Sequence, residues 1–264
     1  MSVPATLVKE LRDQTGAGMM DVKRALEETN GDLEAAKKLL RERGMAQAAK
    51  RAGRQTSEGI VLVTVSGHVG SMVAVGCETE PVSKNAEFLT FAEKALEAVE
   101  GDGPGALEPL DSERTNLVAR LGENIAVVEA VRMEAGEGET LAEYVHPPAN
   151  KIGVLVRLKG ESPVLARQLA MHISFAQPRY RTRDEISAED VEAEREIYSK
   201  QPDVMSKPEH VREKIVDGML QKRFFAESVL SEQVWIHEPA KTVGKALEEA
   251  GLEVLEFRRA ALGA

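Results

Sequence analysis

Apolar residues recur every three or four positions in three stretches between residues 4 and 44, which is the spacing of helices that bury one face. Gly16 and Gly31 interrupt this pattern, and Gly44 is expected to end the third helix. Three helices in about forty residues make a bundle near the lower size limit for folding alone. We therefore expect a small helical domain over residues 1–44 that docks on a larger surface.

The next stretch, residues 45–57, is rich in alanine and basic residues and has no apolar periodicity. This composition is typical of a solvated linker or an exposed helix, and we assign it as a linker. The alternative is that its basic side chains, from Lys50 to Arg54, contact ribosomal RNA.

A hairpin is predicted next, because residues 59–65 and 71–77 are apolar on both faces and a glycine-containing turn separates them. A strand pair of this kind must be covered on both sides. The polar stretch 77–85 follows directly and leads into a helix, roughly residues 86–99, that can cover one side. A short loop between strand and helix can present a few side chains rigidly to a partner. Alternatively, it is a plain connection in which Ser83 or Asn85 caps the helix.

Further along, the pattern of strand, strand and helix recurs between residues 141 and 175, which suggests two related α+β subdomains, over 58–140 and 141–264. Within the second subdomain, residues 187–228 form mostly charged helices with narrow apolar seams. That pattern predicts an antiparallel helical hairpin that projects from the body. The expected fold class is therefore α+β.

Composition narrows the functional classes. The net charge of −10 and the aromatic content of 4% argue against a general nucleic-acid binder. The charge is uneven, because residues 1–55 carry 11 Lys and Arg against 8 Asp and Glu on an otherwise acidic chain. The single Cys77 excludes an internal disulfide framework and fits a reducing compartment. The sequence shows no apolar run of the ~20 residues that a membrane span needs and no signal peptide at Met1–Pro4, so we expect a cytoplasmic protein.

No reaction centre is apparent in the sequence. The five histidines show no paired metal-ligand spacing, and Cys77, at the end of a buried strand, is expected to be inert. Residues 244–246 lack both the earlier glycine and the hydroxyl of a phosphate-binding loop. We expect a binding protein and not an enzyme, with no metal, no cofactor and no nucleotide bound by the chain itself.

One stretch carries a strong resemblance to a known family. Residues 11–26 read Leu-Arg-Asp-Gln-Thr-Gly-Ala-Gly-Met-Met-Asp-Val-Lys-Arg-Ala-Leu. This stretch resembles elongation factor Ts, and further similar segments follow at Arg120–Asn124, Ile152–Val156, Ala170–His172 and Lys241–Gly244. That family catalyses release of GDP from elongation factor Tu, the GTPase that delivers aminoacyl-tRNA to the ribosome.

The resemblance implies an architecture for the whole chain. Residues 1–44 become a ubiquitin-associated-like bundle that docks on the GTPase domain. The remainder becomes two core subdomains, with 187–228 as a coiled-coil insertion. A transient association with the ribosome is a further expectation.

The resemblance also assigns site residues. The Thr-Asp-Phe-Val signature of the family falls on Thr79, Glu80, Pro81 and Val82. In relatives this segment is implicated in disturbing the magnesium site of elongation factor Tu, with the phenylalanine wedged into the GTPase domain. Here Glu80 keeps the acid, but Pro81 replaces the aromatic residue. The positions that match partner-binding segments of the family are Met19, Met20, Lys23, Leu121, Gly122, His146, Ile236 and His237.

Plainer interpretations of these positions stay open at this stage. Gly122 is also an ordinary helix end, and Ile236 an ordinary core residue. For the protein as a whole, the first hypothesis is a guanine nucleotide exchange factor for elongation factor Tu. The alternative is a non-catalytic or chaperone-like partner of that GTPase with weak exchange, because Pro81 cannot supply an aromatic wedge.

Overall fold

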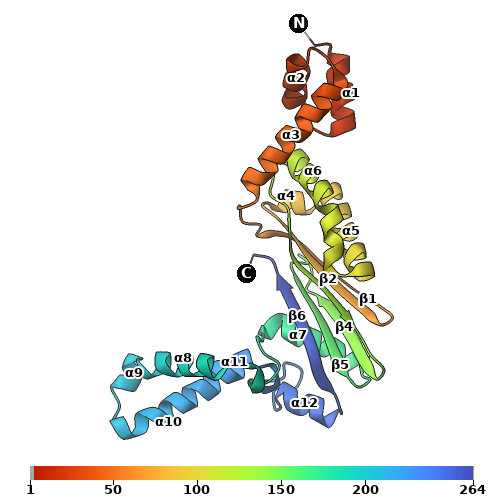
Figure 1. The fold of residues 1–264 in the computed structure, drawn as a ribbon. Helices are drawn as coiled ribbons and strands as arrows, with labels where there is room; N and C mark the ends of the chain where they lie inside the picture. The colour runs from red at the N-terminus through yellow and green to blue at the C-terminus, as the bar shows by residue number, and fades with distance from the viewer. Residues whose placement is uncertain (1–2, 264) are drawn as a thin grey trace.

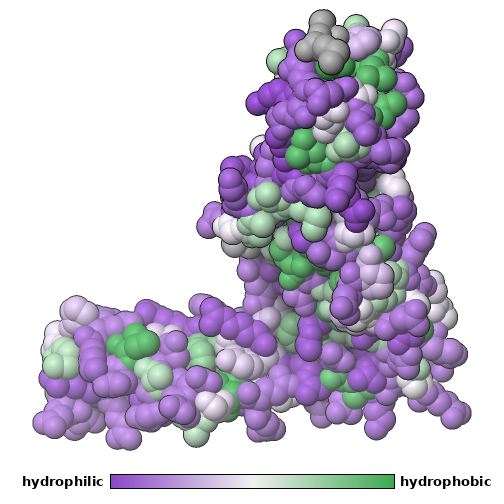
Figure 2. Space-filling view, turned by 45° about the horizontal axis from the view of Figure 1, so that its top comes forward, coloured by the Kyte–Doolittle hydropathy of each residue, from purple (hydrophilic) through white to green (hydrophobic). Residues whose placement is uncertain are grey.

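The computed structural model describes residues 3–263, so Met1 and Ser2 of the predicted bundle lie outside the described part. The molecule is elongated, with a helical bundle at one end, two small sheets in the middle and a helical arm that extends sideways from the other end (Figure 1). In the space-filling view, the bundle and the two sheets form one limb of an L, and the arm forms the other (Figure 2). The predicted α+β fold class is confirmed.

The N-terminal bundle consists of α1 (Ala5–Thr15), α2 (Met19–Glu28) and α3 (Leu33–Arg51). Gly16 ends α1 with a φ of 65°, a left-handed conformation that glycine adopts without steric cost. The bundle has a small apolar core of its own, built from Val8, Leu11, Val22, Ala25, Leu26 and Ala36.

The prediction that Gly44 ends the third helix is wrong, because α3 continues to Arg51 through half of the predicted linker. The reason lies outside the helix. A Cβ on Gly44 would lie 2.7 Å from Cβ of Ala119 in α6 (Asp111–Leu121), so the missing side chain permits close packing of α3 on α6. Ala48, one turn later, is buried in the core of the body. The long helix therefore carries the bundle directly onto the body.

The first sheet is antiparallel, in the order β1-β2-β3, with β1 (Glu58–Ser66), β2 (Val69–Cys77) and β3 (Ala126–Glu134). One face is covered by α5 (Ala86–Asp102), α6 and the end of α3, and its core includes Val73, Val75, Phe88, Phe91, Leu117 and Ile125. A 3-10 helix (Pro104–Leu110) joins α5 to α6.

The second sheet has the order β4-β5-β6, with β4 (Glu139–Val145), β5 (Ile152–Lys159) and β6 (Glu253–Ala261). Its outer face is covered by α7 (Pro163–Ala176) and α12 (Val243–Glu249). Its inner face packs on the first sheet, where Leu155 meets Val61 and Met72 in a shared core. The hairpin of β1 and β2 is thus covered on both sides, as its apolar faces require.

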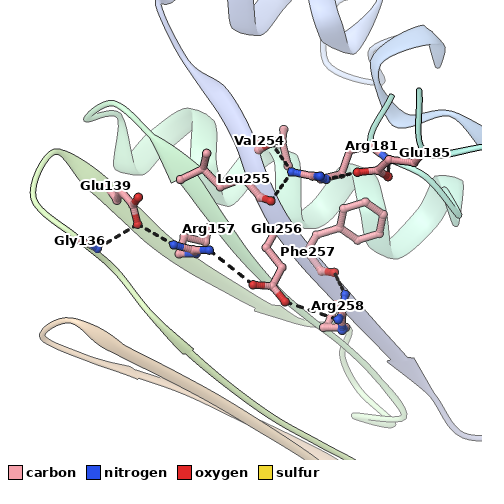
Figure 3. Close-up of polar contacts among 10 residues, drawn as sticks. All are labelled: Gly136, Glu139, Arg157, Arg181, Glu185, Val254, Leu255, Glu256, Phe257 and Arg258. Carbon is pink, nitrogen blue, oxygen red and sulfur yellow. Dashed lines mark hydrogen bonds and ion pairs between the residues drawn. The ribbon is translucent and has the colours of Figure 1, made fainter. Parts of the chain in front are cut away.

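Charged side chains cross the far end of the second sheet (Figure 3). Arg157 pairs with Glu139 at 2.9 Å and with Glu256 at 3.6 Å, which joins all three strands. Arg181, from the loop after α7, donates hydrogen bonds to the carbonyl oxygens of Val254 and Leu255 on the edge strand β6. An edge strand whose carbonyl groups are occupied in this way is protected against pairing with other chains.

The arm is the antiparallel helical hairpin predicted over 187–228. Its elements are α8 (Ala188–Ser199), the one-turn α9 (Pro202–Met205), α10 (Glu209–Met219), a π-helical turn (Leu220–Phe225) and α11 (Ala226–Ser228). It has its own core, formed by Ile186, Val204, Val216, Met219, Leu220, Phe224 and Val229. Short 3-10 turns flank its base at Arg183–Glu185 and Leu230–Glu232. None of the helices within residues 3–263 is long and apolar enough to cross a membrane.

Candidate functional site

The predicted loop at Thr79–Val82 is a single helical turn, α4 (Glu80–Ser83). Thr79 is extended and precedes the turn, and its carbonyl oxygen accepts a hydrogen bond from the Ser83 amide at 3.2 Å. Pro81 fits here, because a proline in the first turn of a helix removes no intrahelical hydrogen bond. The side chains of Thr79, Glu80 and Pro81 are exposed, whereas Val82 packs partly into the core below.

Asn85 then begins α5, with its side-chain oxygen accepting hydrogen bonds from the amides of Glu87 at 2.8 Å and Phe88 at 3.4 Å. The plain interpretation that Asn85 caps this helix is therefore correct for Asn85. It does not exclude a binding role for α4, because the cap leaves the side chains of Glu80 and Pro81 exposed to solvent.

Glu80 carries the acidic group of the turn. Its carboxylate lies 2.6 Å from the ammonium group of Lys84. This hydrogen bond, and then the charge of Lys84, hold the pKa of Glu80 below its usual value, so the carboxylate is ionised at neutral pH. A partner that approaches α4 meets a carboxylate that already has a counter-ion.

Glu123 fixes the start of this turn. Its carboxylate accepts hydrogen bonds from the amides of Glu78 at 3.1 Å and Thr79 at 2.9 Å, and from the Thr79 hydroxyl at 2.5 Å. Sequence reasoning did not single out Glu123. The signal available was its place in the segment Arg120–Asn124, which resembles the family, directly after the candidate contacts Leu121 and Gly122.

These contacts bring two predicted groups of site residues together. Gly122 ends α6 in a left-handed conformation with a φ of 76°, so it is a helix end as well as a candidate contact. Leu121 and Val82 are both partly buried against the same core. The turn Thr79–Val82 and the end of α6 therefore form one continuous surface.

The bundle contributes a neighbouring patch at the start of α2. Met19 and Met20 are 58% and 61% exposed, and Lys23 pairs loosely with Glu27 at 3.7 Å. Two exposed methionines side by side are typical of an adaptable apolar contact surface. A groove of about 580 Å³ runs between the bundle and α6, with Gly18 on one side and Arg120 on the other.

The remaining predicted residues belong to the second subdomain. His146 follows β4 and contacts the Tyr144 hydroxyl at 3.1 Å through Nδ1. His237 contacts the carbonyl oxygen of Gln168 in α7 at 3.1 Å. Ile236 is 39% exposed, so the interpretation of Ile236 as a core residue is wrong. No contact found among residues 3–263 links these three side chains to Glu80.

Two observations bear on chemistry within the site. Burial, followed by the charge of Glu123, raises the pKa of Cys77 to about 12, so this thiol is protonated and donates to the Thr79 carbonyl at 3.3 Å. Across the described residues 3–263, no group of three or more His, Cys, Asp or Glu side chains is placed to hold a metal ion. The features of this surface that a partner could contact are the fixed turn, the exposed apolar side chains and the Glu80 carboxylate.

Comparison with known proteins gives a consistent result. A family model described as Elongation factor TS matches residues 78–264. The protein named Elongation factor Ts from Idiomarina loihiensis is 39% identical over 273 residues, which cover 100% of this chain and 92% of the relative. The protein of that name from Thioalkalivibrio sulfidiphilus is 41% identical over 275 residues, covering 100% and 93%. The one from Escherichia coli O139:H28 is 40% identical over 265 residues, covering 99% and 92%.

Proposed function

Because this chain belongs to the elongation factor Ts family of translation elongation factors, we propose that it is a guanine nucleotide exchange factor for elongation factor Tu. The observation that carries the proposal is the exposed, fixed turn Thr79–Val82 beside Leu121 and Gly122. It occurs in a chain about 40% identical to proteins named Elongation factor Ts over its full length. The proposed setting is the cytoplasm.

Exchange of this kind requires no reaction centre in the chain itself, and we propose that the protein is not an enzyme. The free energy that drives GDP release comes from binding to elongation factor Tu. A partner promotes GDP release only if it binds nucleotide-free elongation factor Tu more tightly than the GDP-bound form. The Glu80 carboxylate provides one source of that difference, since a carboxylate brought near a bound magnesium ion changes the electrostatics of the metal site.

Docking is proposed to use two surfaces. The first combines Met19, Met20 and Lys23 of the bundle with the end of α6 and the turn α4. The second consists of His146, Ile236 and His237 on the other subdomain. Contact at two separated surfaces makes the second contact effectively intramolecular, which adds affinity beyond that of either surface alone.

Pro81 favours a second candidate function. It is exposed at the second position of α4, and its small ring cannot fill a slot made for an aromatic side chain. It does fix its own φ and so stiffens the turn that presents Glu80. A protein with this turn could act mainly as a binding or chaperone-like partner of elongation factor Tu, with weak exchange.

Stopped-flow release of a fluorescent GDP analogue from elongation factor Tu tests the proposal. We expect the protein to accelerate release, and Pro81→Phe to accelerate it further. An apolar wedge is worth roughly 1–3 kcal/mol of differential binding, which is on the order of tenfold in rate or more. Pro202→Phe is the matched control, because Pro202 is also exposed at the start of a one-turn helix, α9, but lies at the far end of the arm.

The outcomes separate the two candidates. Acceleration by the unaltered protein supports the exchange factor. Tight binding to elongation factor Tu without acceleration supports the binding partner. If Pro81→Phe slows release while Pro202→Phe leaves it unchanged, the turn acts in a different way from the one proposed.

A further inference from the structure

Three chain segments meet in one hydrogen-bonded network behind α4. We call the set Arg54, Glu78, Thr79, Glu123 and Asn124 the clamp. Arg54 follows α3, Glu78 and Thr79 follow β2, and Glu123 and Asn124 follow α6. These are the three elements that carry the proposed contacts of the bundle, the turn and the end of α6.

The two acidic residues of the clamp act reciprocally. The Glu123 carboxylate accepts from the backbone amides of Glu78 and Thr79, at 3.1 and 2.9 Å. The Glu78 carboxylate accepts from the backbone amide of Asn124 at 2.7 Å. Each segment thus supplies a carboxylate to the other, and hydrogen bonds from amides to ionised carboxylates are among the stronger ones in proteins. The end of β2 cannot shift relative to the end of α6 without breaking them.

The clamp extends to the bundle through the third segment. Asn124 is buried, at 3% exposure, and its side-chain amide donates to the Arg54 carbonyl oxygen at 2.8 Å. The Arg54 guanidinium group lies 3.3 Å from the Glu78 carboxylate. In contrast, Glu123 forms no ion pair with any residue in 3–263, so its carboxylate is committed to the start of the turn.

The Thr79 hydroxyl bonds to the clamp and not to the helix that it precedes. Thr79 occupies the cap position of α4, where a threonine side chain usually accepts a hydrogen bond from the helix that it precedes. Here it makes no such bond and donates to Glu123 instead. α4 has only four residues, so it has little stability of its own and its position depends on these outside contacts.

From this geometry we infer that Glu123 is a positioning residue for exchange. It holds the turn Thr79–Val82 at a fixed place beside Leu121 and Gly122, so that Glu80 reaches the partner only when the end of α6 is docked. The inference rests on the proposed function. It assigns to Glu123 a role mainly in the maximal rate of GDP release. The affinity is expected to change little, because the docking side chains Met19, Met20 and Lys23 of the bundle make no contact with Glu123.

Glu123→Gln tests the inference, since it keeps the shape and removes the charge. In GDP-release assays at increasing protein concentration, we expect the maximal rate to fall at least about fivefold, because a displaced group loses productive geometry. The concentration at half-maximal rate is expected to stay within about twofold. Glu113→Gln is the control, because Glu113 lies on α6, the helix that precedes Glu123, and pairs with Lys94 at 2.6 Å, outside the clamp.

Two further readouts distinguish positioning from a general loss of stability. In hydrogen-exchange mass spectrometry of the free protein, peptides that cover residues 77–85 are expected to lose protection in Glu123→Gln and not in Glu113→Gln. Thr79→Val is also expected to reduce the maximal rate of GDP release. In the double variant Thr79→Val with Glu123→Gln, the loss of activation free energy is expected to be smaller than the sum of the two single losses, because both substitutions remove the same contact.

The failures are separable. If the unaltered protein does not accelerate GDP release, the proposed function is wrong, and the role of Glu123 in exchange falls with it. If the unaltered protein is active and Glu123→Gln has the same maximal rate, the role of Glu123 alone is overturned. Unchanged protection of residues 77–85 in Glu123→Gln also overturns it.

Discussion

At the scale of single residues, burial decides the charge state of His172. This side chain is fully buried on α7, with Nε2 2.9 Å from the side-chain oxygen of Gln233 and its ring 5.3 Å from that of Trp235. Burial lowers the pKa of His172, the hydrogen bond to Gln233 opposes this shift, and the charge of His237 adds to it. Its Nδ1 has no partner within residues 3–263, so protonation there would place an unpaired N–H group in the core, which disfavours the charged form.

This predicts a loss of stability on acidification. The pKa of His172 is lower in the folded state than in the unfolded state, so its contribution is complete above the unfolded value near 6.5 and is lost as the pH falls below it. Urea unfolding at pH 7.5 and at pH 5.5 measures the free energy of unfolding at each pH. Between these two values, the free energy of unfolding of His172→Gln should fall by on the order of 1 kcal/mol less than that of the unaltered protein. The exposed His210 on the arm provides the control, His210→Gln. An identical pH effect in all three proteins would contradict the assignment.

At the scale of elements, the arm is a self-contained unit. Its helices share one apolar core, and Arg183, 4.2 Å above the ring of Phe225, fixes its base. We predict that replacement of residues 190–222 by a short Gly/Ser turn leaves the thermal unfolding of the body nearly unchanged and preserves GDP release. A collapse of the whole fold, measured by circular dichroism, would show that the arm is part of the body.

Sequence patterns predicted the elements well where local signals and burial agree. The hairpin of β1 and β2, its double coverage and the cap at Asn85 all follow from apolar spacing and cap chemistry. Gly44 shows where this fails, because its value as a close contact with Ala119 outweighs its weak helix propensity. Glu123 could not be derived from periodicity at all, since its contacts join residues 44 and 45 positions apart in the chain. The family resemblance included Glu123 in the segment Arg120–Asn124 but assigned a contact role only to its neighbours Leu121 and Gly122.

At the scale of the whole molecule, the elements that carry the candidate contacts belong to two parts of an elongated body (Figure 1). The bundle, α4 and the end of α6 form one region, tied together by the clamp and by the packing of α3 on α6. His146, Ile236 and His237 form the other, on the second subdomain. A rigid body that contacts its partner at two separated places can hold one conformation of that partner in preference to another, which is the requirement for exchange.

The central claim is that the chain distinguishes nucleotide-free from GDP-bound elongation factor Tu, and titration calorimetry tests it directly. The affinity of the chain is measured for elongation factor Tu without nucleotide and at saturating GDP. We predict that GDP weakens binding of the chain at least about tenfold, and that the chain weakens GDP binding by the same factor, because coupling between two sites is reciprocal. Equal affinities in the two titrations would contradict the account, since a partner that binds both forms equally cannot shift the equilibrium between them.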